Sequence, residues 1–186
     1  MLSVIIATLD SERALLASLA ALVPGAMDGL ISEVIVADGG SSDDTATVAD
    51  VAGCNFRVTE GPTGRRLKTA AAAARAPWLL FLRPGTVLDP AWTGEVRRFV
   101  ERSPPDARAA VFARWRTAQP NFRGVLSLLA AALGAPPRPE QGLLIAHGFY
   151  DDLGCHSDLA ADPEADLVRR IGRRRIVTLA TGITAR

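Results

Sequence analysis

The sequence has little of what marks several large classes of protein. Its two cysteines, Cys54 and Cys155, form neither a CxxC pair nor a disulfide framework. Lysine and arginine number 21 against 20 aspartates and glutamates, so the chain lacks the basic excess expected of a nucleic-acid-binding protein. No apolar run reaches the ~20 residues needed to span a bilayer. We therefore expect no nucleic-acid partner and no membrane-spanning helix.

The sequence also lacks a signal peptide, because it begins directly with a strand-like apolar run. Together with the few cysteines, this predicts a reducing, cytoplasmic location. A second hypothesis is peripheral contact with the inner face of the membrane, through the apolar segment 124–133 and the basic residues Arg169, Arg170 and 173–175. The alternative explanation for these arginines is that they complement the dipole at a helix end.

Composition and periodicity predict a single α/β domain with a mostly parallel sheet. Of the 186 residues, 48% are hydrophobic and 22% are charged, which suits one buried core. Strand-like runs alternate with helical patterns, as in parallel sheets with crossover helices. The predicted strands are 2–8, 33–37, 55–59, 78–82, 109–115, 142–146 and 175–179. The predicted helices are 11–23, ended by Pro24-Gly25, then 43–52, 65–76, 91–101, 122–133 and 164–171.

Polar loops follow the first four predicted strands. Ligands of open α/β sheets bind beyond the carboxyl ends of the strands, so the loops 8–12, 38–44, 61–68 and 83–89 are the candidate site. The second loop places the carboxylate of Asp38 at a strand end, followed by two glycines and a helix N-terminus. Such a loop can bind a base or a ribose. A local Asx turn with a helix cap explains the same residues, and both interpretations stay open.

Two segments at matching spacing carry a family resemblance. SVIIATLDSE, residues 3–12, resembles the opening SVIIPTLNEE of family 2 glycosyltransferases, and EVIVADGGSSDDT, residues 33–45, resembles their EVIVVDGGSSDGT. Residues 65–86 resemble RQLNAGAAAARGDWLLFLHADT of a bacterial branch of that family. Residues 140–143 and 163–170 resemble its DQGLF and EDVELSRRL. The resemblance implies the GT-A fold, with a nucleotide-binding half (1–89), an acceptor-side half (90–186), and sugar transfer from a nucleotide-diphosphate donor to a hydroxyl acceptor.

The resemblance also implies roles for individual residues. The nucleotide would be bound by Thr8, Asp10, Glu12, Asp38, Gly39, Arg65 and Lys68, with Asp38 on the base or ribose and Arg65 facing the diphosphate. Lys68 stands where asparagine is usual. Glu164 corresponds to the acid that deprotonates the acceptor hydroxyl. Since this acid is usually an aspartate, the extra methylene would move the base by ~1 Å, which matters for proton transfer.

The turn after the fourth predicted strand departs from the family. Arg83-Pro84-Gly85-Thr86 stands where HADT is expected, so Gly85 replaces the aspartate that helps to hold Mg²⁺ or Mn²⁺ against the diphosphate. In one hypothesis Arg83 and Lys68 add their positive charge to that of Arg65 and Arg66, these basic groups stabilise the leaving diphosphate without a metal, and the protein is a glycosyltransferase. In the other it is a catalytically inactive nucleotide-binding or scaffold protein. Asp89 is a candidate replacement ligand, although its place before Pro90 favours a helix cap.

Three other patterns carry less weight. His147, Cys155, His156 and Asp158 match no zinc-site spacing, which favours a surface loop with an incidental Cys-His pair. The loop after the first strand is acidic and contains no glycine, unlike that of a nucleotidyltransferase. No GxGxxG follows that strand, which disfavours a dinucleotide oxidoreductase. Neither the donor sugar, nor the acceptor, lipid-linked or soluble, nor the oligomeric state follows from these patterns.

Overall fold

The first four strands form a parallel sheet at the centre of the molecule. The structure, a computed structural model, describes residues 1–103, 108–114 and 137–185. Strands β1 (Leu2–Thr8), β2 (Ile31–Asp38), β3 (Asn55–Val58) and β4 (Trp78–Leu82) lie in the order β3-β2-β1-β4. All five residues of β4 are buried, as expected of a parallel strand covered on both faces. Because the four strands are parallel to one another, their carboxyl ends lie at the same edge of the sheet.

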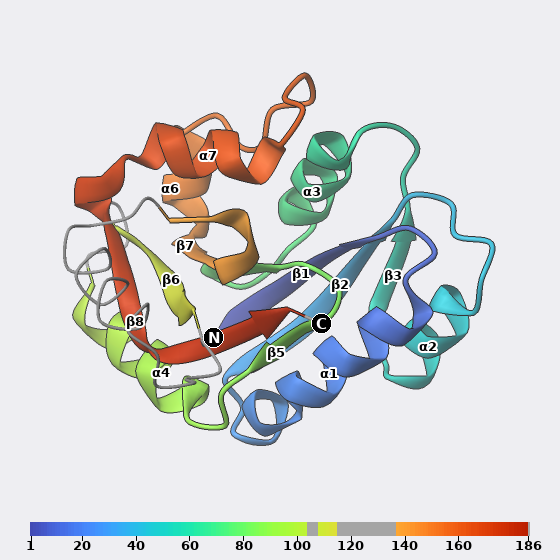
Figure 1. Ribbon diagram of the computed structural model, residues 1–186, viewed down its shortest axis with the longest axis horizontal. Coiled ribbons are helices and arrows are strands. Elements are labelled where there is room, and N and C mark those ends of the chain that lie inside the picture. The colour runs from blue at the N-terminus through green and yellow to red at the C-terminus, as the bar shows by residue number, and fades with distance from the viewer. Residues whose placement is uncertain (104–107, 115–136, 186) are drawn as a thin grey trace, which may run out of the picture.

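The later strands extend the sheet beyond β4 and curl it. They are β5 (Thr86–Leu88), β6 (Ala109–Arg114), β7 (Leu143–Ala146) and β8 (Ile176–Ala185). The order continues β4-β7-β6-β8-β5, with β7 antiparallel to both neighbours and β6 parallel to β8. Although β5 directly follows β4, it pairs antiparallel with β8 at the other end of the order. The sheet thereby curls back towards its own first half (Figure 1).

Helices cover both faces of this sheet (Figure 1). On one side lie α1 (Glu12–Met27), α2 (Thr45–Val51) and α4 (Trp92–Arg102). On the other lie α3 (Thr63–Ala72), α6 (His147–Asp152) and α7 (Pro163–Ile171), and short 3-10 turns occupy Pro139–Gln141 and Arg173–Arg175. The α/β class predicted from the sequence is confirmed. In the described part of the chain, no helix is long and apolar enough to cross a membrane.

The first predicted helix boundary is wrong, because α1 continues through Pro24 to Met27. Proline removes one backbone N–H and frees a carbonyl in the preceding turn. The indole N–H of Trp92 donates to the Ala21 carbonyl in that turn, at 3.2 Å. Gly25 then packs so closely on the Trp92 ring that a Cβ there would lie 2.5 Å from it. Packing against Trp92 therefore stabilises a turn that local propensity would end.

Other predicted boundaries also differ. Helix α3 ends at Ala72 rather than 76, β8 extends to Ala185 rather than 179, and β5 and α6 were not predicted. The predicted helix 122–133, and with it the apolar part of the hypothetical membrane contact, lies outside the described residues.

Candidate active site

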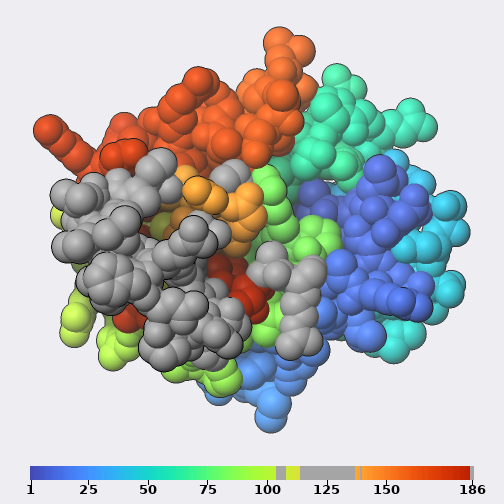
Figure 2. Space-filling model, viewed as in Figure 1, coloured from blue at the N-terminus to red at the C-terminus, as the bar shows by residue number. Residues whose placement is uncertain are grey.

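A cleft of about 640 Å³ opens at the carboxyl ends of β1 and β4. Its walls come from the loop after β1, the start of α3, the turn after β4 and the segment that leads into α7. Figure 2 shows the chain that follows β4, in green, at the surface between the orange C-terminal segment and the blue N-terminal segment. The cleft thus joins both halves of the chain at the edge where the sequence predicted a ligand.

Asp38 ties the loops after β1 and β2 together. Its carboxylate accepts hydrogen bonds from the Thr8 hydroxyl at 2.7 Å, the Ser41 hydroxyl at 2.5 Å, and the backbone N–H groups of Gly40 and Ser41. Burial raises the pKa of Asp38, but the hydrogen bonds from Ser41, Thr8 and Gly40 outweigh burial and leave the pKa below its ordinary value. Asp38 is 1% exposed, so it shapes the loop from within.

The neighbouring acids make similar loop-to-loop contacts. Asp10, with a φ of 45°, accepts a hydrogen bond from the backbone N–H of Ser42 at 2.7 Å. The backbone N–H of Glu12 donates to Asp43 at 3.0 Å. Thr8 lines the cleft, while Asp10 and Glu12 stand beside it on the loop that leads into α1. These contacts hold the first two loops in one fixed arrangement.

Arg66, rather than Arg65, is the arginine of α3 that lines the cleft. Its side chain is 8% exposed and donates to the Thr8 carbonyl at 2.5 Å and the Thr63 hydroxyl at 2.9 Å. Its Nε is buried without a hydrogen-bond partner among the described residues. Arg65 is more than half exposed and pairs with Asp158 at 3.4 Å. Lys68, also exposed, contributes a positive charge beside Cys155.

Gly39 makes the position of Arg66 possible. A Cβ at Gly39 would lie 2.6 Å from the Arg66 guanidinium, so a side chain there would push the guanidinium out of this position. From the sequence, Arg66 was counted only among the positive charges near the expected diphosphate, and Arg65 was assigned the binding role. The signal that could have singled out Arg66 is this pairing of a glycine after β2 with an arginine at the start of α3.

Arg83 lies within a ring of three carboxylates. Its guanidinium is 2.5 Å from Glu164, 3.3 Å from Asp162 and 3.7 Å from Glu140. These acids come from the N-terminal end of α7 and from the 3-10 turn before β7, far apart in sequence. The two residues predicted to act in catalysis, Glu164 and Arg83, therefore form an ion pair in the wall of the cleft.

Glu164 is an acid of the cleft whose pKa is raised. Burial raises the pKa of Glu164 above its ordinary value, and the Arg83 guanidinium opposes that increase without cancelling it. Asp162 and Glu140 add to the increase through their negative charges. A carboxylate with a raised pKa in a cleft is suited to accept a proton from a bound hydroxyl.

Comparison with known proteins identifies the family. The sequence model for Glycosyl transferase family 2 matches residues 3–148. The chain belongs to glycosyl transferase family 2. No curated protein matches it significantly.

Solved structures show the same GT-A fold. Glucosyl-3-phosphoglycerate synthase from Mycobacterium tuberculosis, in complex with Mn²⁺, UDP and glucosyl-3-phosphoglycerate, superposes with a TM-score of 0.73 at 19% identity, over 100% of this chain and 72% of that one. Its complex with Mn²⁺ and UDP-glucose gives 0.72 at 20%, over 100% and 71%. A mycobacterial protein gives 0.73 at 21%, over 100% and 67%. Identities this low show the fold alone.

At the turn after β4, the described residues offer no side-chain ligand in place of the family aspartate. Gly85, at the position of the family aspartate, has a φ of 84° and donates its backbone N–H to the Ala14 carbonyl at 2.9 Å. Asp89 accepts a hydrogen bond from the backbone N–H of Ala91 at 2.8 Å in the turn before α4, so it acts locally. Within residues 1–103, 108–114 and 137–185, no group of three His, Cys, Asp or Glu side chains is placed to hold a metal ion, and the three carboxylates around Arg83 surround its guanidinium instead.

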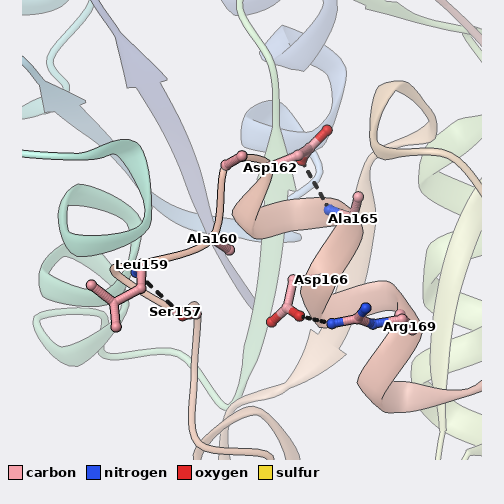
Figure 3. Close-up of a pocket in the computed structure, with 8 residues that line it drawn as sticks. Ser157, Leu159, Ala160, Asp162, Ala165, Asp166 and Arg169 are labelled. Carbon is pink, nitrogen blue, oxygen red and sulfur yellow. Dashed lines mark hydrogen bonds and ion pairs between the residues drawn. The ribbon is translucent and has the colours of Figure 1, made fainter.

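A second, more open pocket of about 500 Å³ lies beside the cleft and shares Asp162 with it. Figure 3 shows that its labelled polar groups already bind one another. Asp162 accepts from the backbone N–H of Ala165, Asp166 pairs with Arg169, and the backbone N–H of Leu159 donates to Ser157. In this family 2 chain, the labelled polar groups of the pocket next to the cleft are therefore largely hydrogen-bonded to one another.

The prediction that Cys155 and His156 form a surface pair is wrong for the histidine. His156 is 1% exposed and lies 2.9 Å from the Tyr150 hydroxyl, because Phe81 and Tyr150 pack around its ring. The basic residues after it have local roles. Arg170 donates to the carbonyls of Leu153 and Cys155, and the Arg175 guanidinium lies over the Phe149 ring.

Proposed function

We propose that this protein transfers a sugar from a nucleoside-diphosphate donor to a hydroxyl acceptor without a divalent cation. The observation that supports the proposal is the cleft itself, in which Arg66, Arg83 and Glu164 line the carboxyl edge of a family 2 sheet. Two guanidinium groups supply fixed positive charge, and a buried carboxylate supplies a base. Mn²⁺, UDP and UDP-glucose occur in complexes of the fold relative named above, which favours a nucleoside-diphosphate sugar as the donor.

The donor would lie with its diphosphate against Arg66 and Arg83. Arg66 lines the cleft and is already fixed by its hydrogen bonds to Thr8 and Thr63. Charge-assisted hydrogen bonds from preorganised arginines are effective where phosphate charge develops. Asp38 would act mainly by holding the Gly39 to Ser41 backbone for the base or ribose. Arg65 and Lys68, being exposed, would act at the rim.

Glu164 would act as the general base. It would remove the proton from the acceptor hydroxyl as the hydroxyl oxygen attacks the anomeric carbon and the bond to the diphosphate breaks. The sugar configuration would invert, because the displacement occurs in a single step. Arg83 would transfer from Glu164 to the leaving diphosphate during this step, since both anions compete for the same guanidinium.

A second candidate function is nucleotide binding without turnover. The observation that favours it is the 2.5 Å ion pair between Arg83 and Glu164, which engages the proposed base in the absence of substrate. In that case the nucleotide would bind but the carboxylate would stay paired.

Calorimetry with UDP, GDP and dTDP, each with Mn²⁺, Mg²⁺ or EDTA, tests the proposal. We expect binding in EDTA, and a loss of about 10- to 100-fold in affinity in Arg83→Ala, as for the loss of a hydrogen bond to a charged group. Arg98→Ala, which removes an equal charge from α4, is the matched control and should bind normally. Binding only with metal would contradict metal independence, and no binding at all would reject the donor class.

Turnover separates the two candidate functions. Hydrolysis of the best-bound donor sugar, or its transfer, should be lost in Glu164→Gln while nucleotide affinity is kept. A wild-type protein that binds nucleotide but never consumes any donor sugar would support the non-catalytic candidate instead.

A further inference from the structure

His156 is buried with one of its ring nitrogens unused. Its Nδ1 lies 2.9 Å from the Tyr150 oxygen, and the edge of its ring meets Phe81 with centroids 4.7 Å apart. Its Nε2 has no hydrogen-bond partner in the described part of the chain. An unpaired buried polar atom of this kind costs about 1–3 kcal/mol, so its presence calls for a partner that the described residues do not provide.

The Tyr150 contacts fix which nitrogen carries the proton. The Tyr150 oxygen accepts the backbone N–H of His156 at 3.1 Å, so its own hydroxyl proton is free to be donated. The acceptor within reach is Nδ1. A neutral imidazole whose Nδ1 accepts carries its proton on Nε2. The unused atom is therefore a hydrogen-bond donor.

His156 lines a small, partly enclosed cavity that is also lined by Glu164. The cavity lies between β4, β7 and α7, with Phe81, Arg138, His156 and Glu164 among its walls. Its volume of about 10 Å³ has room for about one water molecule. Glu164 lines the open cleft as well, so this residue borders both the cleft and the cavity.

We propose that His156 is a positioning residue whose Nε2–H, through a single buried water, donates a hydrogen bond to Glu164 and holds that carboxylate ionised and directed towards the cleft. This role rests on the proposed function, in which Glu164 is the base. The water satisfies Nε2 on one side and the carboxylate on the other. No proton is transferred to His156, which acts only as a donor.

The surrounding charges explain why such a donor matters. Glu164 faces Arg83 from the turn after β4, Asp162 from the start of α7, Glu140 from the 3-10 turn, and Arg138 across the cavity. If the donor diphosphate engages Arg83, Glu164 loses its nearest cation while both acids remain. The hydrogen bond that His156 donates lies inside the protein, so it is unaffected when Arg83 moves from Glu164 to the diphosphate. It therefore keeps the Glu164 carboxylate ionised.

His156 itself stays neutral over the working range. Burial and the positive charge of Arg170 lower its pKa to about 3, against a smaller opposing effect of Asp166. Tyr150, the other titratable group in contact, is neutral as well, because burial raises its pKa. A change in the titration of Glu164 on substitution of His156 would therefore reflect the lost donor and not a lost charge.

A carboxyl ¹³C NMR titration of the full chain, labelled at glutamate Cδ and without any ligand, tests the proposal. Comparison with Glu164→Gln assigns the resonance. In His156→Phe we expect the acid dissociation constant of Glu164 to fall about tenfold. His156→Gln, whose amide N–H can reach the same water, should restore most of the difference. His147→Phe, on α6 but outside the cavity, is the control.

A Glu164 titration that is unchanged in His156→Phe, or changed equally in His156→Gln, would overturn the proposal. If His156→Phe does not fold, Tyr150→Phe replaces it. Without the hydroxyl, Nδ1 can carry the proton, so the dissociation constant should fall by a smaller factor, and no change would reject the role. Because the titration uses neither a nucleotide-sugar nor turnover, its result is independent of whether the protein proves to be a transferase.

Discussion

At the scale of single residues, the carboxyl end of β2 depends on a buried negative charge. Asp38 accepts hydrogen bonds from Thr8 and Ser41 side chains and from two backbone N–H groups, so every partner donates to it. An ionised carboxylate is the side chain that can accept from so many donors at once. The charge therefore organises the loop even before a nucleotide is present.

Asp38→Asn should lower the free energy of unfolding by about 2–3 kcal/mol at neutral pH, because the amide NH₂ would oppose the N–H donors of Gly40 and Ser41. The folded pKa of Asp38 lies below its ordinary value of 3.8. Its contribution is thus fully present above that ordinary value and is lost as pH falls through the folded pKa. Urea unfolding of both proteins from pH 7 to pH 3 should show the difference shrinking below about pH 4.

Asp44→Asn is the control for this comparison, since Asp44 is exposed and makes no side-chain cap hydrogen bond. A difference between wild type and Asp38→Asn that stays constant down to pH 3 would show that the charge of Asp38 is not what stabilises the loop.

Residue identities in the site were only partly predictable. Thr8, Asp38 and Arg83 could be located from motif and loop position, because strand ends place those side chains at one edge, whereas Glu164, in the first turn of α7, could be located from its motif alone. The choice between Arg65 and Arg66 could not, since it depends on which face of α3 meets the first two loops. The ion pair of Arg83 with Glu164 could not be predicted either, because it depends on how the segment before α7 packs against the turn after β4.

At the scale of elements, the start of α3 and the segment before α7 form a tight junction beside the cleft. A Cβ at Gly64 would lie 2.0 Å from the backbone carbonyl oxygen of Ser157 and 3.2 Å from Pro163. Since a backbone atom cannot move alone, any side chain at this position must displace the segment that carries Asp162 and Glu164. Gly64 therefore sets how closely the two walls of the cleft approach.

Gly64→Ala should destabilise the protein by about 1–3 kcal/mol, as overpacking does in well-packed interiors. Gly94→Ala is the matched control, because Gly94 lies in α4 and a Cβ there would have no atom within 4 Å, so alanine should stabilise that helix by about 0.5–1 kcal/mol. Urea denaturation of both variants should give changes of opposite sign in the free energy of unfolding. Equal effects would mean that the α3 to α7 junction yields without cost.

The type of an element could be predicted from the sequence where the apolar run was nearly continuous, as for β1 and β4. The boundaries of the elements could not be predicted. The continuation of α1 through Pro24 depends on Trp92, which is 71 residues beyond the Ala21 carbonyl that it binds. The short strand β5 has only three residues and gains its partner from β8, near the other end of the sequence. The local sequence pattern indicates neither of these contacts, because each joins residues that are far apart in the sequence.

At the scale of the whole molecule, the two halves share one sheet. Strand β4, in the nucleotide-binding half, pairs with β7 of the other half, and β5 pairs only with β8. Buried residues from both halves belong to one core cluster, which includes Phe81 and Leu144. The predicted halves 1–89 and 90–186 thus share one sheet and one core, and neither half closes its own sheet edge.

We therefore expect a single cooperative unfolding transition, because an isolated half would expose the β4 edge and much of the shared core. Urea unfolding of the full chain, followed by far-UV circular dichroism and by tryptophan fluorescence, should give coincident curves. The fragment 1–89 should show no cooperative transition of its own. If that fragment unfolded cooperatively with native-like secondary structure, the nucleotide-binding half would be an independent folding unit. The cleft would then be a junction between two units, and nucleotide binding by the fragment alone would become the decisive measurement of where the affinity for the donor lies.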